Sequence, residues 1–88
     1  MDLPTRSIWL EVRVELKPGV ADAEAESVEK SLGLLGIAGV RHVATARIFD
    51  LEFVDLTPAE AHRRTEEAVE RLLANPVIHR VTIRPKSD

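Results

Sequence analysis

The three histidines of this sequence are the first residues to consider for chemistry, because imidazole serves both as a metal ligand and as a general base. They are His42, His62 and His79. None has a partner at a zinc-site spacing of the H-E-x-x-H type. The chain has no cysteine, which excludes thiolate zinc sites, disulfides and cysteine nucleophiles. We therefore expect solvated or edge histidines.

The serines and glycines provide no recognisable nucleophile or phosphate loop. No serine stands in a G-x-S-x-G elbow, and Ser27 and Ser31 lie on the polar side of a predicted helix. A phosphate-binding glycine cluster follows a strand and opens a helix. Gly33, Gly36 and Gly39 instead close a predicted helix and lead into a strand, so we expect capping and turn roles.

Four carboxylates gather on one face of the predicted sheet, next to Arg13. A general acid and base could be built from such a set, but a flat, open face offers no water-excluding pocket. We predict that these carboxylates are solvated or line an interface, and that the chain holds no catalytic, cofactor-binding or metal-binding residue. The four are Glu11, Glu15, Asp50 and Glu52.

Trp9 is the only tryptophan, and strand alternation places it on the face opposite the core. A single aromatic residue on a polar surface can supply a large share of the area of an interface. Two interpretations stay open for Trp9: a partner contact, or partial burial under the ends of the chain itself.

The elements that position these residues follow from hydrophobic periodicity. Apolar residues alternate from Ile8 to Leu16 and predict a strand that ends at Lys17-Pro18-Gly19. A helix follows, with Asp22 as its N-cap and Gly36 as its C-cap. Its apolar stripe comprises Ala21, Ala25, Val28, Leu32 and Leu35.

The second half of the chain again predicts strand followed by helix, and it ends with a further strand. Val40 to Asp55 reads as two strands or one long bent strand, with a break near Ala44 to Arg47. Thr57-Pro58-Ala59-Glu60 is a capping box that opens a helix, and Asn75-Pro76 ends that helix. The predicted buried stripe of this helix is Ala61, Ala68, Val69, Leu72 and Leu73, and the last strand holds Val77, Val81 and Ile83.

The element order β-α-β-β-α-β predicts an α+β fold, a ferredoxin-like two-layer sandwich with an antiparallel sheet and both helices on one face. The connections are too short for a second domain. We therefore expect a single domain over residues 1–88, with a core at about 8–84 and flexible ends at 1–7 and 85–88.

Composition limits the classes of function. The 88 residues carry 12 basic and 15 acidic side chains, a formal charge of −3, which argues against a nucleic-acid partner. No apolar run approaches the length of a membrane span, and the first residues lack the apolar core of a signal peptide. The sequence thus predicts a cytoplasmic protein without a membrane partner, whose small core favours association.

Two motifs stand out at the ends of the two predicted helices: Leu16-Lys17-Pro18-Gly19-Val20 with Asp22 soon after, and Leu72-Leu73-Ala74-Asn75-Pro76-Val77-Ile78. They resemble the motifs of the PurS family, the small subunit of phosphoribosylformylglycinamidine (FGAM) synthase. The resemblance extends from about Ile8 to Arg84.

The resemblance implies a non-catalytic assembly subunit of purine biosynthesis. It would associate with itself as a dimer or tetramer and bridge a glutaminase subunit of the PurQ type and a synthase subunit of the PurL type. Those partners would use glutamine, ATP and Mg, whereas this chain would bind no cofactor. Ammonia would then pass to formylglycinamide ribonucleotide without escaping to water.

Seven residues are interface candidates, chosen from the family motifs and from the open sheet face. Ala46-Arg47 departs from the Gly-Lys pair of relatives; Arg47 keeps the charge, but alanine does not readily take a positive φ. The candidates are Trp9, Lys17, Pro18, Gly19, Arg47, Asn75 and Pro76.

Two other functions are possible on the residues alone. An amino-acid-sensing module of the ACT type shares this element order and a Pro-Gly turn after its first strand, although Lys17 stands where an acid is typical. An autonomous enzyme is the third possibility, and it would require turnover by the isolated chain.

Overall fold

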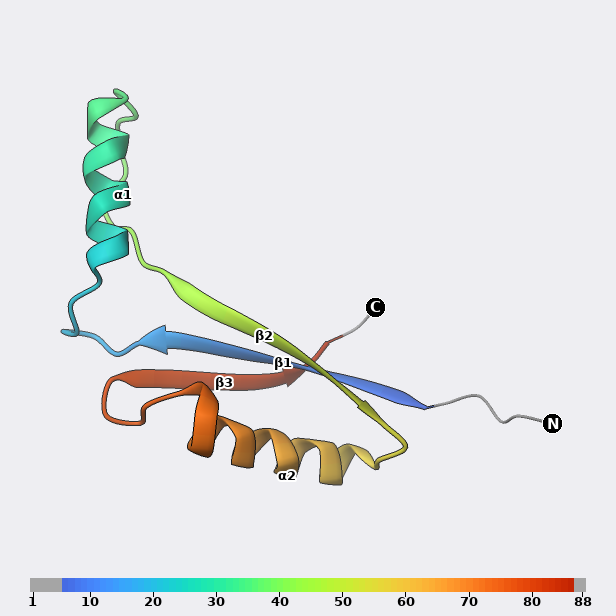
Figure 1. The fold of residues 1–88 in the computed structure, drawn as a ribbon. Helices are drawn as coiled ribbons and strands as arrows, with labels where there is room; N and C mark the ends of the chain where they lie inside the picture. The colour runs from blue at the N-terminus through green and yellow to red at the C-terminus, as the bar shows by residue number, and fades with distance from the viewer. Residues whose placement is uncertain (1–5, 87–88) are drawn as a thin grey trace.

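The structure, a computed structural model, describes residues 6–86 and consists of three strands and two helices (Figure 1). No helix in this part of the chain is long and apolar enough to cross a membrane. The elements are β1 (Ser7–Leu16), α1 (Ala23–Leu34), β2 (Ala46–Val54), α2 (Pro58–Ala68), the π-helical turn η1 (Val69–Leu73) and β3 (His79–Pro85).

The sheet is antiparallel, with β1 in the centre and the order β2-β1-β3. Val12 lies opposite Phe49 of β2 and Ile83 of β3, so these three side chains share one face. The alternation predicted for β1 is confirmed, because Leu10, Val12 and Val14 are its buried residues.

Helix α2 covers the apolar face of the sheet by packing on β1. The predicted capping box is present: Glu60 N donates to Thr57 Oγ1 over 3.2 Å, and Thr57 N donates to Glu60 Oε2 over 3.4 Å. Ala61 and Thr65 of α2 are fully buried over the sheet.

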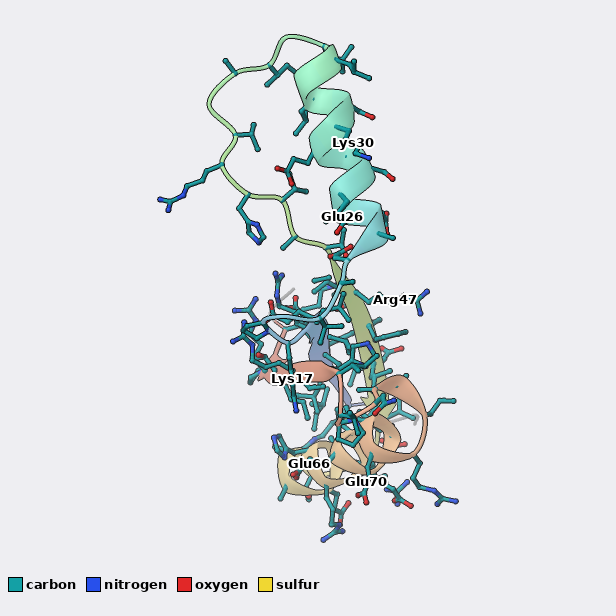
Figure 2. The ribbon with its side chains drawn as sticks, turned by 90° about the vertical axis from the view of Figure 1, so that its left-hand side faces the viewer. Lys17, Glu26, Lys30, Arg47, Glu66 and Glu70 are labelled. Carbon is teal, nitrogen blue, oxygen red and sulfur yellow. The ribbon has the colours of Figure 1, made fainter. Side chains whose placement is uncertain are left out.

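The α+β class, the antiparallel sheet and the ferredoxin-like element order are confirmed, but two details of the prediction differ. Residues 40–45 form no strand, and the break near Ala44 is where β2 begins, at Ala46. The prediction that both helices cover one face is wrong for this single chain: α1 extends from the end of the sheet, on the side away from α2 (Figures 1 and 2).

Strand pairing explains the position of α1. A helix between two parallel strands must run back along the sheet, whereas antiparallel neighbours enter and leave at the same end. Strands β1 and β2 are such neighbours, so α1 belongs to a long hairpin connection and need not return over the sheet.

Part of the two chain ends that were predicted to be flexible belongs to ordered strands. Of the segments predicted to be flexible, residues 1–5 and 87–88 lie outside the described residues. Ser7 and Pro85 belong to β1 and β3, and Lys86 N donates to Trp9 O over 3.0 Å, so ordered pairing extends beyond the predicted core.

Candidate interaction surface

The face of the sheet opposite α2 carries the predicted set of charged residues. The register places Glu11 beside Asp50 of β2 and Arg84 of β3, and Glu15 beside Arg80. Acids on β1 and β2 thus meet bases on β3. The interpretation of one shared open face is confirmed.

Ion pairs balance the charges of this face. Arg84 Nε lies 3.0 Å from Glu11 Oε1, Arg80 Nε lies 3.3 Å from Glu15 Oε1, and Lys86 Nζ lies 2.6 Å from Asp50 Oδ2. These pairs are solvent-accessible, so each contributes no more than about 1 kcal/mol to stability. Glu11, Glu15 and Asp50 thus serve as ion-pair partners across the sheet.

Trp9 lies on the same open face and is half-buried. Lys86 Nζ is 5.7 Å from the centroid of the indole ring, within cation–π range. Part of the burial of Trp9 therefore comes from its own chain, and the rest of the ring remains available on the open face.

The two family motifs meet at one end of the sheet. Lys17 Nζ donates to Pro76 O over 2.6 Å, and Lys17 N donates to Ile78 O over 2.8 Å. Gly19 has a φ of 87°, a left-handed conformation that glycine adopts without steric cost. We call residues 17–19 and 75–78 the corner.

The Asn75 turn is held by its own hydrogen bonds. Val77 N donates to Asn75 Oδ1 over 2.9 Å, and Asn75 N donates to His79 Nδ1 over 2.9 Å. Side-chain bonds of this kind fix a turn without help from a helix or sheet ladder. The corner therefore presents Pro18 and Pro76 on a defined backbone.

Asp22 anchors the start of α1, as predicted, and also binds the segment that returns from α1. Its carboxylate accepts hydrogen bonds from Ala25 N at 2.9 Å, Thr45 Oγ1 at 2.8 Å and Thr45 N at 3.1 Å. The Ala25 N–H, followed by the Thr45 hydroxyl, holds the pKa of this carboxyl below its ordinary value of 3.8. No local pattern in the sequence indicates Thr45 as its partner.

Arg47 lies away from the corner. Its position opposite Val14 puts it on the α2 side of the sheet, where it is exposed, and Figure 2 shows it set apart from Lys17. Ala46 pairs with Glu15 as an ordinary strand residue, and within residues 6–86 the only non-glycine positive φ belongs to Asp55. The alanine thus fits its site without strain.

The candidate residues therefore occupy three places: the corner, the open face and the Arg47 site. The histidines are separate from each other, with His62 Nδ1 2.9 Å from Glu66 Oε1 and His79 held at the Asn75 turn. Among the described residues, no cluster of three His, Cys, Asp or Glu side chains could hold a metal ion.

This arrangement defines a small α+β protein with an open, charged sheet face and an ordered corner. Residues 10–87 match the family model of PurS, described as phosphoribosylformylglycinamidine (FGAM) synthase. The chain belongs to the PurS family.

Individual relatives agree with this assignment. The PurS subunit of FGAM synthase from Archaeoglobus fulgidus is 44% identical over 73 residues, which cover 83% of this chain and 91% of the relative. The crystal structure of Methanocaldococcus jannaschii PurS superposes with a TM-score of 0.79 at 30% identity, covering 92% of this chain and 98% of that one. These matches favour PurS over the ACT-type alternative.

A solved structure with lower sequence identity also has a chain of this fold. One chain of the structure of PurLQS from Thermotoga maritima has a TM-score of 0.83 at 22% identity, covering 92% of this chain and 99% of that one. This likeness shows the same fold over nearly the whole chain.

Proposed function

We propose that this chain is the assembly subunit of an FGAM synthase and bridges a glutaminase subunit and an ATP-dependent synthase subunit. The observation that carries the proposal is the PurS match over residues 10–87. The Thermotoga maritima fold relative comes from a structure described as PurLQS, which supports partners of the PurL and PurQ types.

The division of labour follows from the chemistry of ammonia transfer. A glutaminase releases ammonia, and a synthase that uses ATP and Mg adds it to the activated amide of formylglycinamide ribonucleotide. Ammonia that escapes into water is diluted and protonated. The active sites of the glutaminase and the synthase must therefore be held in a fixed position relative to each other. A small protein with ordered surfaces can hold them without contributing a reacting group.

We propose the corner as a partner contact. Lys17 joins two turns that are remote in sequence, and a pre-ordered turn loses little conformational entropy when a partner binds it. We propose Trp9 and Arg47, which lie on other surfaces, as separate partner contacts. Separate contact surfaces suit a chain that binds more than one other protein.

We also propose that the chain associates with itself and that it is located in the cytoplasm. The absence of cysteine is compatible with the reducing conditions of the cytoplasm.

Co-sedimentation tests the bridging role. We expect the PurL-type and PurQ-type subunits of the same organism to sediment as one complex when this chain, glutamine and ATP with Mg are present. Without the chain, we expect them to sediment separately. Stable association of the two large subunits in its absence would contradict the proposal.

A further inference from the structure

A groove of about 350 Å³ lies between the end of the α2 helical segment and β3. Val69 and Ala74 line it on the helical side, and Val81 and Ile83 line it on the strand. These four apolar side chains are only half-buried, so the groove is open to solvent. A concave apolar surface of this size can hold apolar side chains of another molecule.

The π-helical turn η1 shapes the groove. An α-helix closes each turn with a hydrogen bond to the residue four positions back, whereas Ala74 N donates to Val69 O, five positions back, over 3.1 Å. Turns of this kind are rare and are found frequently at functional sites. Both residues of this bond line the groove, so its width depends on the wide turn.

Strand β3 forms the other wall and is an outer strand of the sheet. Its register pairs it with β1, and within residues 6–86 no strand pairs with its far edge. Every second residue of such an edge leaves its backbone N–H and C=O without a strand partner. An extended segment of another protein can bind these groups and insert alternate side chains into a neighbouring pocket.

The helical rim of the groove is acidic. Glu66 and Glu70 line it, and Figure 2 shows both on the part of the helical segment nearest the corner. Glu66 lies 2.9 Å from His62, whereas Glu70 forms no ion pair within residues 6–86. A basic side chain of a partner would therefore meet an unpaired carboxylate at Glu70.

The open-face side of the same edge is basic. Arg80 and Arg84 each donate through Nε to an acid of β1, yet their side chains remain 60% and 62% exposed. A second copy paired antiparallel along the whole of β3, about Thr82, would place Arg80 of one copy opposite Arg84 of the other. Like charges directly opposite each other destabilise a sheet. The edge is therefore better suited to a different strand, with carboxylates at these positions.

We propose that the outer edge of β3 binds an extended segment of one of the two large subunits, an inference that rests on the proposed assembly function. Apolar side chains of this segment enter the groove, and alternate carboxylates face Arg80 and Arg84. On the groove side the segment also carries a lysine or arginine next to Glu70. Pro76 lines the end of the groove, so this site continues the corner.

Hydrogen exchange tests the site in the assembled protein. Exchange is measured on the free chain and on the chain with the PurL-type subunit, the PurQ-type subunit, or both, in the presence of glutamine and ATP with Mg. We expect the fast-exchanging amides within residues 79–85 to slow at least tenfold when one of the two subunits binds. Unchanged exchange of these amides in every mixture would overturn the proposal.

Variants of the helical rim and the strand provide a second test. Glu70→Lys should raise the dissociation constant for that subunit at least tenfold, and Val81→Thr, which keeps a β-branched side chain, at least threefold. Glu70 is exposed, so its reversal leaves the fold intact. Glu67→Lys is the matched control, because Glu67 pairs with Arg71 and does not line the groove. This control should stay within twofold of the parent chain, and equal effects of E70K and E67K would contradict the site.

The exchange result separates this site from the assembly function. If the large subunits require this chain to associate but the amides of β3 do not slow, the edge site is wrong and the assembly role stands. If one subunit slows these amides but the two large subunits associate without this chain, the proposed function is wrong and the edge site stands.

Discussion

At the scale of single residues, Asp22 joins local and long-range structure. Its carboxylate caps α1 and also holds Thr45, which lies 23 residues further along the chain. The cap was predictable because an acid before an apolar stripe is a local signal. The bond to Thr45 was not, since no periodic pattern specifies which residue of a long connection returns to the helix start.

Asp22 gives a pH prediction. Its pKa is lowered in the folded chain, so its stabilising effect is fully present above the unfolded pKa of about 3.9 and is lost as the pH falls through the folded value. We expect Asp22→Asn to melt below the parent chain at pH 6. The difference should shrink as the pH falls below 4.

Circular dichroism melts from pH 2.5 to pH 7 measure this difference. The comparison with D22N isolates Asp22 from the other carboxylates, which titrate in both proteins. If the difference in melting temperature between D22N and the parent chain stays constant down to pH 2.5, the charge of Asp22 has no part in holding α1 and Thr45.

Lys17 gives a second residue-level prediction. Lys17→Met removes the bond to Pro76 O but keeps most of the aliphatic side chain, so we expect a loss of about 1 kcal/mol or less at this exposed site. Amide exchange at Val77 and Ile78 should accelerate severalfold. Lys30→Met on α1 is the matched control, and similar acceleration in both variants would rule out a specific tie at the corner.

At the scale of elements, the sequence predicted some features of α2 correctly and others incorrectly. Its start was predicted correctly, because a capping box is encoded within four residues. The helical segment also ends just before Asn75-Pro76, as predicted, but its buried face does not continue to that end: Leu72, predicted to be buried, is 81% exposed. The helix widens into η1, where Ala74 N donates to Val69 O over 3.1 Å, and this wider turn rotates Leu72 off the buried stripe.

The capping box gives a prediction for α2. Thr57→Ala removes the acceptor for Glu60 N and should lower the free energy of unfolding by about 1 kcal/mol. Thr57→Ser keeps the hydroxyl and should remain close to the parent chain. Urea denaturation followed by Trp9 fluorescence measures both variants; equal stability of T57A and the parent would contradict a stabilising cap.

The other element-level difference concerns residues 40–45. The apolar residues Val40 and Val43 predicted a strand, but strand formation also requires a neighbour with free hydrogen-bonding groups. In the single chain these residues run beside α1 instead. The local hydrophobic pattern therefore shows only that residues 40–45 could form a strand. Whether they do depends on pairing with a segment that is remote in sequence.

At the scale of the whole molecule, the sequence predicted the fold class and the family but not the extended shape. Core residues such as Val12 follow from alternation, and the PurS motifs occupy defined positions in the chain. The overall shape depends on the end of the sheet at which α1 begins and on whether α1 packs back over the sheet. That choice involves packing among segments far apart in sequence.

The central claim is that this chain acts by holding two other proteins together. The most direct measurement compares FGAM formation by the PurL-type and PurQ-type subunits, with and without this chain, using glutamine or ammonium salt as the nitrogen source. We predict that the chain raises glutamine-dependent synthesis at least tenfold and changes ammonia-dependent synthesis less than twofold. Equal glutamine-dependent rates with and without the chain, or turnover by the chain alone, would contradict the account.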